Sequence, residues 1–360
     1  MIDDFFKHEP YELARNEKQQ LLLSELLYLT DFHSKGCPEY RHFLDSLDNF
    51  DMQSVRKIED IPFFPVRLFK EISLKSLPDE QIIKKTTSSG TTSQMKSVLY
   101  IDKETAALQQ KASVKQLTNF WGKKRLPFLI IDTESTISNR KQYSARASGI
   151  MGMRFFSTEM VFALDDDMNL REDVVAAFLE KHKDQPFVVF GYTFIVWQNF
   201  YKALVKSDMT LKMENAILMT GGGWKKFEDQ GVSKEVFQSE MTRTCGIRRF
   251  LDHYGMAEQV ASIYCECECG HLHASIFSDV IVRNPFTLEP CKIGEEGIIQ
   301  VLSVLPSSYP GHSLLTEDIG MIEGEDDCPC GRKGKYIKIR GRMKKAEVRG
   351  CSDTYDPRLS

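Results

Sequence analysis

One loop of this sequence places hydroxyl side chains on both sides of a glycine and ends in a lysine. Thr86–Lys96 reads Thr-Thr-Ser-Ser-Gly-Thr-Thr-Ser-Gln-Met-Lys. Backbone amides at a glycine turn and hydroxyl donors suit phosphate oxygens, and a lysine ammonium adds a positive charge. The spacing is not that of a Walker loop, and on composition alone a solvated Ser/Thr-rich loop is an equal alternative. The candidate phosphate-binding residues are Lys96, Ser88, Ser89, Gly90, Thr91, Thr92 and Ser93.

Cysteine and histidine residues gather in two short segments, Cys265–His273 and Cys328–Cys330. Four thiolates close a tetrahedral structural zinc site, and a closed site has no open position for water. We therefore expect a zinc staple between the main domain and a β-rich subdomain, with a cluster of reduced surface thiols as the alternative. The expected ligands are Cys267, Cys269, Cys328 and Cys330, with Cys265, His271 and His273 as alternates.

Short apolar runs alternate with helical patterns through the middle of the chain. The runs are 128–131, 187–190 and 216–219, and helical patterns cover 103–121, 171–182 and 194–207. Apolar runs separated by helices predict an α/β fold whose strands are covered on both faces. Ligands in such sheets bind beyond the carboxyl ends of strands, so the glycines that follow two of the runs should border the site. These glycines are Gly191, Gly221, Gly222 and Gly223.

The segments before and after this α/β pattern differ from it in composition. Leu, Glu, Lys and Gln dominate residues 10–35, which predicts one or two amphipathic helices, and the prolines of Ile61–Pro65 mark a junction. Strand-like pieces separated by turns follow from about residue 275. We expect a helical segment at 1–60, an α/β core at 61–275, a β-rich subdomain at 276–342 and a short tail at 343–360.

The bulk composition limits the class of partner. A formal net charge of −4 arises from 47 basic and 51 acidic residues mixed along the chain, which gives no basic footprint for nucleic acid. We expect no membrane insertion, because neither an export signal nor a spanning apolar run is evident. A small molecule or another protein is the expected partner, and the cytoplasm is the expected location.

Several segments together resemble the adenylate-forming enzymes, the superfamily of acyl-CoA synthetases and luciferases. The run "SSGTTSQMK" is similar to their phosphate loop. His253–Glu258 resembles the element whose aromatic residue, here Tyr254 before Gly255, lies on adenine and whose carboxylate, here Glu258, reaches magnesium. Thr316–Gly320 and Gly341–Gly350 are similar to the elements that place Asp318 on the ribose hydroxyls and Arg342 on the ribose-phosphate side. Glu317 and Lys344 depart from the usual glycine and hinge aspartate.

Two longer motifs resemble one branch, the LuxE-type acyl-protein synthetases. These motifs are Ile61–Lys70, which reads "IPFFPVRLFK", and Thr220–Lys225, which reads "TGGGWK". The resemblance implies an adenylating domain with β-sheets flanked by helices and a small β-rich subdomain. It also implies that the usual C-terminal domain is largely absent, because the sequence stops at Ser360. In that family a cysteine in a "GC" context near the C-terminus carries the acyl group, and Cys351 matches it.

The resemblance implies ATP- and Mg²⁺-dependent activation of a fatty or aromatic acid to an acyl-adenylate, followed by acyl transfer to a protein thiol. The catalytic residues would be Lys96, Glu258 and Cys351, and Gly221–Gly223 would add nucleotide contacts. An acyl-accepting reductase or carrier protein is the expected protein partner. One alternative is an acyl-CoA ligase of the phenylacetate type, and another is a non-catalytic zinc-containing assembly module.

Overall fold

The computed structural model describes residues 2–48, 50–87, 96–138, 145–223 and 231–343. The chain divides into two compact units. The first combines residues 1–88, 95–120 and 254–347, and the second combines 89–94, 121–253 and 348–360. The four segments expected from the sequence follow chain order and stay a prediction, whereas these units join stretches far apart in sequence.

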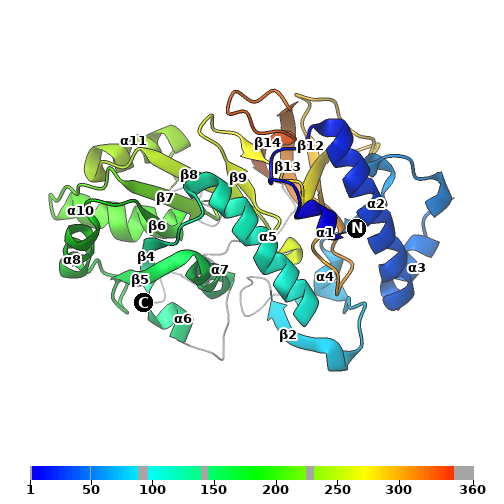
Figure 1. The fold of residues 1–360 in the computed structure, drawn as a ribbon, viewed down its shortest axis with the longest axis horizontal. Coiled ribbons are helices and arrows are strands. Elements are labelled where there is room, and N and C mark those ends of the chain that lie inside the picture. Colours follow the sequence, from blue (N-terminus) through cyan, green and yellow to red (C-terminus); the bar gives the residue numbers. More distant parts are fainter. Residues whose placement is uncertain (1, 49, 88–95, 139–144, 224–230, 344–360) are drawn as a thin grey trace. The chain divides into compact units, whose positions relative to one another are not determined.

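The second unit is built on parallel strands in the order β5-β4-β6-β7-β8 (Figure 1). Every residue of β4, β6 and β7 is buried, as expected for strands covered on both faces. The expected apolar runs are therefore confirmed as strands, and the α/β fold class is confirmed. The strands are β4 (Leu126–Thr133), β5 (Ser157–Leu164), β6 (Phe187–Tyr192), β7 (Ala216–Gly221) and β8 (Arg249–Tyr254).

Helices connect these strands. The segment expected to be one helix over 194–207 contains a π-helical turn at Val196–Tyr201 between two short α-helices, a feature that is frequent at functional sites. α11 begins at the Ser233 cap, whose hydroxyl accepts from the Val236 amide, and ends at Gly246 with a φ of 71°. The helices are α6 (Ser135–Ser138), α7 (Ala145–Met153), α8 (Glu172–His182), α9 (Thr193–Ile195), α10 (Lys202–Lys206) and α11 (Lys234–Cys245), with a 3₁₀ turn at Arg154–Phe156.

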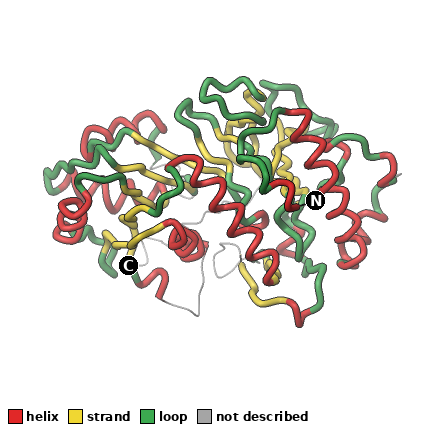
Figure 2. The backbone as a smooth tube through the Cα atoms, viewed as in Figure 1, coloured by secondary structure: helices red, strands yellow, loops and turns green. Residues whose placement is uncertain are grey.

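The first unit holds an antiparallel arrangement in the order β11-β12-β13-β14-β10-β9, with β1 parallel to β13 and a separate β2–β3 hairpin. The long strands that follow residue 275 correspond to the strand-like pieces of the sequence in that region (Figure 2). The strands are β1 (Phe64–Pro65), β2 (Ile82–Thr87), β3 (Val98–Asp102), β9 (Tyr264–Glu266), β10 (Leu272–His273), β11 (Ser278–Arg283), β12 (Gly297–Ser303), β13 (Ser313–Glu325) and β14 (Lys335–Arg342).

N-terminal helices complete this unit. α2 packs Leu22, Leu26 and Leu29 into a core shared with β11 and β12. No helix among the described residues is long and apolar enough to cross a bilayer. The helices are α1 (Ile2–Phe5), α2 (Arg15–Gly36), α3 (Pro38–Asp45), α4 (Leu68–Glu71) and α5 (Lys103–Trp121), and 3₁₀ turns lie at Met52–Ser54, Ile58–Asp60, Asp79–Gln81 and Ala257–Gln259.

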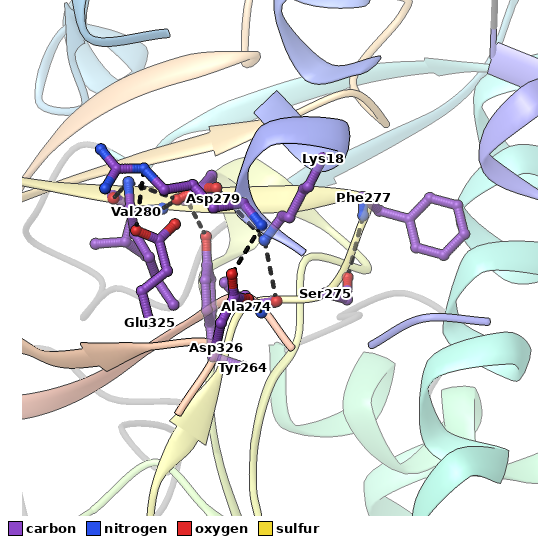
Figure 3. A network of polar contacts seen from close by, with 12 residues as sticks. Lys18, Tyr264, Ala274, Ser275, Phe277, Asp279, Val280, Glu325 and Asp326 are labelled. Atoms are coloured by element: carbon purple, nitrogen blue, oxygen red, sulfur yellow. Dashed lines mark hydrogen bonds and ion pairs between the residues drawn. The ribbon is translucent and has the colours of Figure 1, made fainter. Parts of the chain in front are cut away.

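A buried ionic network joins α2 to the strands of this unit (Figure 3). Asp279 on β11 lies 3.4 Å from the Lys18 ammonium and 3.0 Å from that of Lys335, and all three side chains are buried. Burial opposes ionisation of Asp279, but the two lysines hold its pKa below its usual value. The carboxylate therefore neutralises part of the charge of two buried ammonium groups.

Asp279→Asn should destabilise the protein by about 3–5 kcal/mol, because it leaves two buried ammonium groups without their carboxylate. Urea unfolding measures the change. The matched control is Asp31→Asn on α2, the helix that carries Lys18. Its exposed ion pair with Lys35, at 2.6 Å, should contribute less than about 1 kcal/mol. Equal effects of the two substitutions would contradict a special role for the network.

Candidate functional site

Tyr254, Asp318 and Arg342 meet in the first unit. The Tyr254 hydroxyl donates to Asp318 Oδ2 at 2.7 Å, and Arg342 Nε donates to Asp318 Oδ1 at 3.1 Å. Antiparallel pairing of β13 with β14 places Asp318 opposite Arg342, so the strand register fixes the ion pair. Each carboxylate oxygen has two lone pairs and keeps one acceptor position after these bonds. Asp318 can therefore still accept from the two hydroxyls of a diol.

The surroundings hold these side chains in place. The Asp318 amide donates to Thr316 Oγ1 at 3.1 Å, and that hydroxyl donates to the Ile299 carbonyl at 2.7 Å. The Tyr254 ring lies 5.7 Å from the Tyr264 ring. Burial, reinforced by the Asp318 charge, raises the pKa of Tyr254 well above its usual value. Tyr254 is thus a neutral hydrogen-bond donor to an anionic partner.

Glu258 lies on the 3₁₀ turn Ala257–Gln259 and is buried. The next residue anchors this turn, because the Gln259 side-chain amide donates to the carbonyls of Val301 and Gly311 at 3.1 and 2.8 Å. Gly255 is exposed, and so is Lys96. The loop residues Ser88–Ser93 and the candidate acyl carrier Cys351 lie outside the described residues.

Three glycines follow β7 in the second unit. Gly222 and Gly223 have φ values of 84° and 57°, which side-chain-bearing residues rarely adopt. A Cβ at Gly221 would lie 2.3 Å from His253 Cε1. The register opposes Gly221 to His253, whose ring covers the glycine. Sequence reasoning did not assign His253 a role, although its place directly before Tyr254 offered the signal.

Gly221→Ala should destabilise the protein by about 1–3 kcal/mol, because the new methyl group overlaps the His253 ring. Gly152→Ala is the matched control in the same unit, since a Cβ there meets nothing within 4 Å. That change should be neutral or stabilising by up to about 1 kcal/mol, because alanine favours a helix. Urea unfolding of both variants tests the close approach of the His253 ring to Gly221. Equal stability of Gly221→Ala and Gly152→Ala would refute it.

Cysteine and histidine side chains also meet in the first unit. The potential ligand atoms of Cys267, His273, Cys328 and Cys330 all lie within 4.8 Å of one another. Cys267 Sγ is 3.8 Å from Cys328 Sγ, and Cys330 Sγ is 3.4 Å from His273 Nε2. Bond lengths of about 2.3 Å to sulfur and 2.0–2.1 Å to nitrogen in a tetrahedron imply separations of about 3.8 and 3.5 Å. The residues therefore fit a tetrahedral metal ion.

The structure departs from the expected ligand set in one position. Cys269 is exposed and lies outside this group, because its turn directs its backbone amide, rather than its thiol, toward Cys267 Sγ at 3.4 Å. His273, an alternate in the sequence-based set, takes its place. His271 Nδ1 lies 3.2 Å from Cys328 Sγ and its ring stacks on Tyr336, whereas Cys265 is buried outside the group.

Comparisons of the sequence with known proteins agree with one another. Residues 1–360 match the family described as "Acyl-protein synthetase, LuxE". A long-chain-fatty-acid–luciferin-component ligase of Vibrio harveyi is 23% identical over 98% of this chain and 92% of its own length. The ligase of the same description from Aliivibrio fischeri is also 23% identical, with the same coverage of each chain.

A solved structure shares the fold. It is 2-hydroxyisobutyryl-CoA ligase in an open conformation, in complex with 2-HIB-AMP and CoA, with a TM-score of 0.72 at 14% identity over 94% of this chain and 77% of that chain. The resemblance to adenylate-forming enzymes is thereby confirmed for the fold. The family match does not favour the non-catalytic module or the CoA ligase, and it supports an enzyme that activates an acid and transfers the acyl group. The chain belongs to the LuxE family of acyl-protein synthetases.

Proposed function

We propose that this chain uses ATP to convert a fatty acid to an acyl-adenylate and then transfers the acyl group to a protein thiol. The observation that carries the proposal is the arrangement of Tyr254, Asp318 and Arg342, which leaves a buried, oriented carboxylate ready for a ribose diol. Relatives named for long-chain fatty acids favour a fatty acid over an aromatic one.

Each proposed residue has a distinct task. Asp318 holds the ribose hydroxyls, Tyr254 lies on the adenine, and Arg342 contributes positive charge on the ribose-phosphate side. Lys96 and the loop Ser88–Ser93 bind the phosphates and offset charge that builds on their oxygens, which is usually the largest catalytic contribution. Gly221–Gly223 add further nucleotide contacts. Glu258 would hold Mg²⁺, which supplies electrostatic stabilisation of the leaving pyrophosphate.

The proposed reaction has two steps. A carboxylate oxygen attacks the α-phosphorus, and pyrophosphate leaves. A thiol sulfur then attacks the acyl carbon, and AMP leaves. We propose Cys351 as that thiol, with an acyl-accepting reductase or a carrier protein as the next acceptor.

Labelling tests the acyl acceptor directly. The full chain, incubated with ATP, Mg²⁺ and radiolabelled tetradecanoic acid, should acquire label that hydroxylamine removes. Cys351→Ser should abolish this label, whereas Cys291→Ser, the matched control at another cysteine outside the metal cluster, should retain it. Label that persists in Cys351→Ser, or that appears only on added coenzyme A, would refute the proposed acceptor.

We also propose that Cys267, His273, Cys328 and Cys330 bind a structural zinc ion. The support is the separation of their ligand atoms, which suits a tetrahedral site closed by four protein ligands. Cys267 follows β9, His273 ends β10, and Cys328 and Cys330 lie between β13 and β14, so the ion would tie two hairpins of one unit. Thiol ligands that must stay reduced suit the cytoplasm, where we propose that the protein works.

A further inference from the structure

His253 ends the stretch 121–253 of the second unit and is the penultimate residue of β8, and its imidazole ring is oriented by one hydrogen bond. Its Nδ1 lies 2.8 Å from the carbonyl oxygen of Thr220, at the end of the neighbouring strand β7. A carbonyl oxygen can only accept, so Nδ1 must carry the proton in this bond. In the neutral ring, the other nitrogen, Nε2, is therefore a proton acceptor.

The protein environment favours the neutral ring. Burial lowers the pKa of His253, although the charge of Asp252 opposes this shift. Asp252 is half-buried, its carboxylate accepts from the His253 amide at 2.8 Å, and desolvation raises its pKa. Lys234 of α11 is the cation that acts on Asp252. Above its lowered pKa, His253 thus presents a basic nitrogen rather than a cation.

The ring of His253 also packs closely against the backbone of the neighbouring strand. The imidazole covers Gly221, where any side chain would overlap it. Among the described residues, Nε2 has no hydrogen-bond partner. The carboxyl ends of β7 and β8 meet here, which is the edge at which open α/β sheets bind ligands. The next residue in the chain is Tyr254, to which the proposed function assigns the adenine.

A neutral acceptor nitrogen limits the chemistry that His253 can perform in the proposed reaction. The reacting groups of the first step, the α-phosphate and the substrate carboxylate, are anions with no proton to lose. The acceptor thiol, in contrast, enters the second step with a proton that it must lose, since the thiolate is the nucleophile. A thiol with a pKa of about 8.5 is only a few per cent ionised at pH 7.

We propose that His253 is the general base of the acyl-transfer step. Nε2 takes the thiol proton while sulfur bonds to the acyl carbon, and the bond from that carbon to the phosphate oxygen breaks. AMP leaves with the electron pair of that bond, and the imidazolium then releases its proton to water. This inference rests on the proposed function and assigns His253 to its second step alone.

Separate measurement of the two steps tests the role. Adenylation is followed by ATP–pyrophosphate exchange with tetradecanoic acid, and transfer by AMP release from preformed tetradecanoyl-adenylate in a single turnover. In His253→Asn, the amide can still donate to the Thr220 carbonyl, but no basic nitrogen remains. At pH 7 we expect transfer to fall by about 100-fold or more, as for loss of a general base, while exchange changes by less than about threefold.

The pH dependence distinguishes a base from a structural residue. Above the lowered pKa of His253, transfer by the unmodified protein should be nearly independent of pH. Transfer by His253→Asn should rise about tenfold per pH unit until the thiol ionises by itself near pH 8.5. A residue that only supports the fold would not create this slope.

His253→Gln provides a second variant if the asparagine form does not fold, and His42→Asn, at an exposed histidine, is the matched control. Equal losses of exchange and transfer, or a pH-independent loss of transfer, would overturn the assignment of His253. Absence of pyrophosphate exchange in the unmodified protein with any acid would instead overturn the proposed function, so the two failures are distinguishable.

Discussion

Asp318→Asn should raise the KM for ATP by about 100-fold in ATP–pyrophosphate exchange. The substitution keeps the shape of the side chain but removes the charge that receives the Tyr254 hydroxyl and the Arg342 guanidinium. It also replaces one acceptor oxygen with a donor, which cannot accept from a ribose hydroxyl. Hydrogen bonds to charged groups contribute about 1.5–3 kcal/mol each, so the loss of one and the weakening of the other account for a change of about this size.

The matched control for Asp318→Asn is Glu323→Gln on the same strand. Its carboxylate lies 3.9 Å from the exposed Lys338 ammonium, in a pair that should contribute little to stability or activity. The control should leave the KM for ATP within about twofold of the unmodified value. An unchanged KM for ATP in Asp318→Asn would contradict the assignment of this carboxylate to the nucleotide.

Removal of the metal should produce the largest loss of stability. Cys328→Ser should abolish bound zinc and lower the Tm by on the order of 10 °C, because ligand loss removes a large part of a metal-binding free energy that is coupled to folding. The metal content of the purified protein, measured by elemental analysis, should fall from about one zinc per chain to near zero. Chelation of the unmodified protein should lower the Tm in the same direction.

Cys269→Ser is the decisive control for the metal site. Cys269 is exposed and lies outside the group of Cys267, His273, Cys328 and Cys330, so its substitution should leave zinc content and Tm unchanged. His273→Ala should instead reduce both. Loss of zinc in Cys269→Ser together with retention in His273→Ala would show that the ligands are the four cysteines.

Local patterns in the sequence predicted the elements well. The helix expected over 103–121 is α5 (Lys103–Trp121), and the three apolar runs are central parallel strands. These predictions succeed because the hydrophobic periodicity of a helix or a buried strand can be read from residues only a few positions apart. The π-helical turn at Val196–Tyr201 was not predictable in this way, since its side chains continue an ordinary helical composition.

The sites depend on longer-range information. The pairing of Asp318 with Arg342 follows from the register of β13 against β14, which no local pattern states. The exchange of Cys269 for His273 has a similar origin. The Gly270 amide donates to the Cys267 carbonyl at 2.9 Å in a turn that leaves Cys269 exposed, while β10 carries His273 into the cluster. The residue types in the sequence thus identified the kinds of site, a nucleotide site and a metal site. The turn at Gly270 and the strand register decide which side chains meet there.

ATP–pyrophosphate exchange, measured across acids of graded chain length and aromaticity, tests the proposed activity most directly. We expect exchange that requires Mg²⁺ and an added acid, that is strongest with a long-chain fatty acid, and that Asp318→Asn nearly abolishes at low ATP concentration. Absence of exchange with every acid, from a protein that is folded and carries one bound zinc, would contradict the proposed activity.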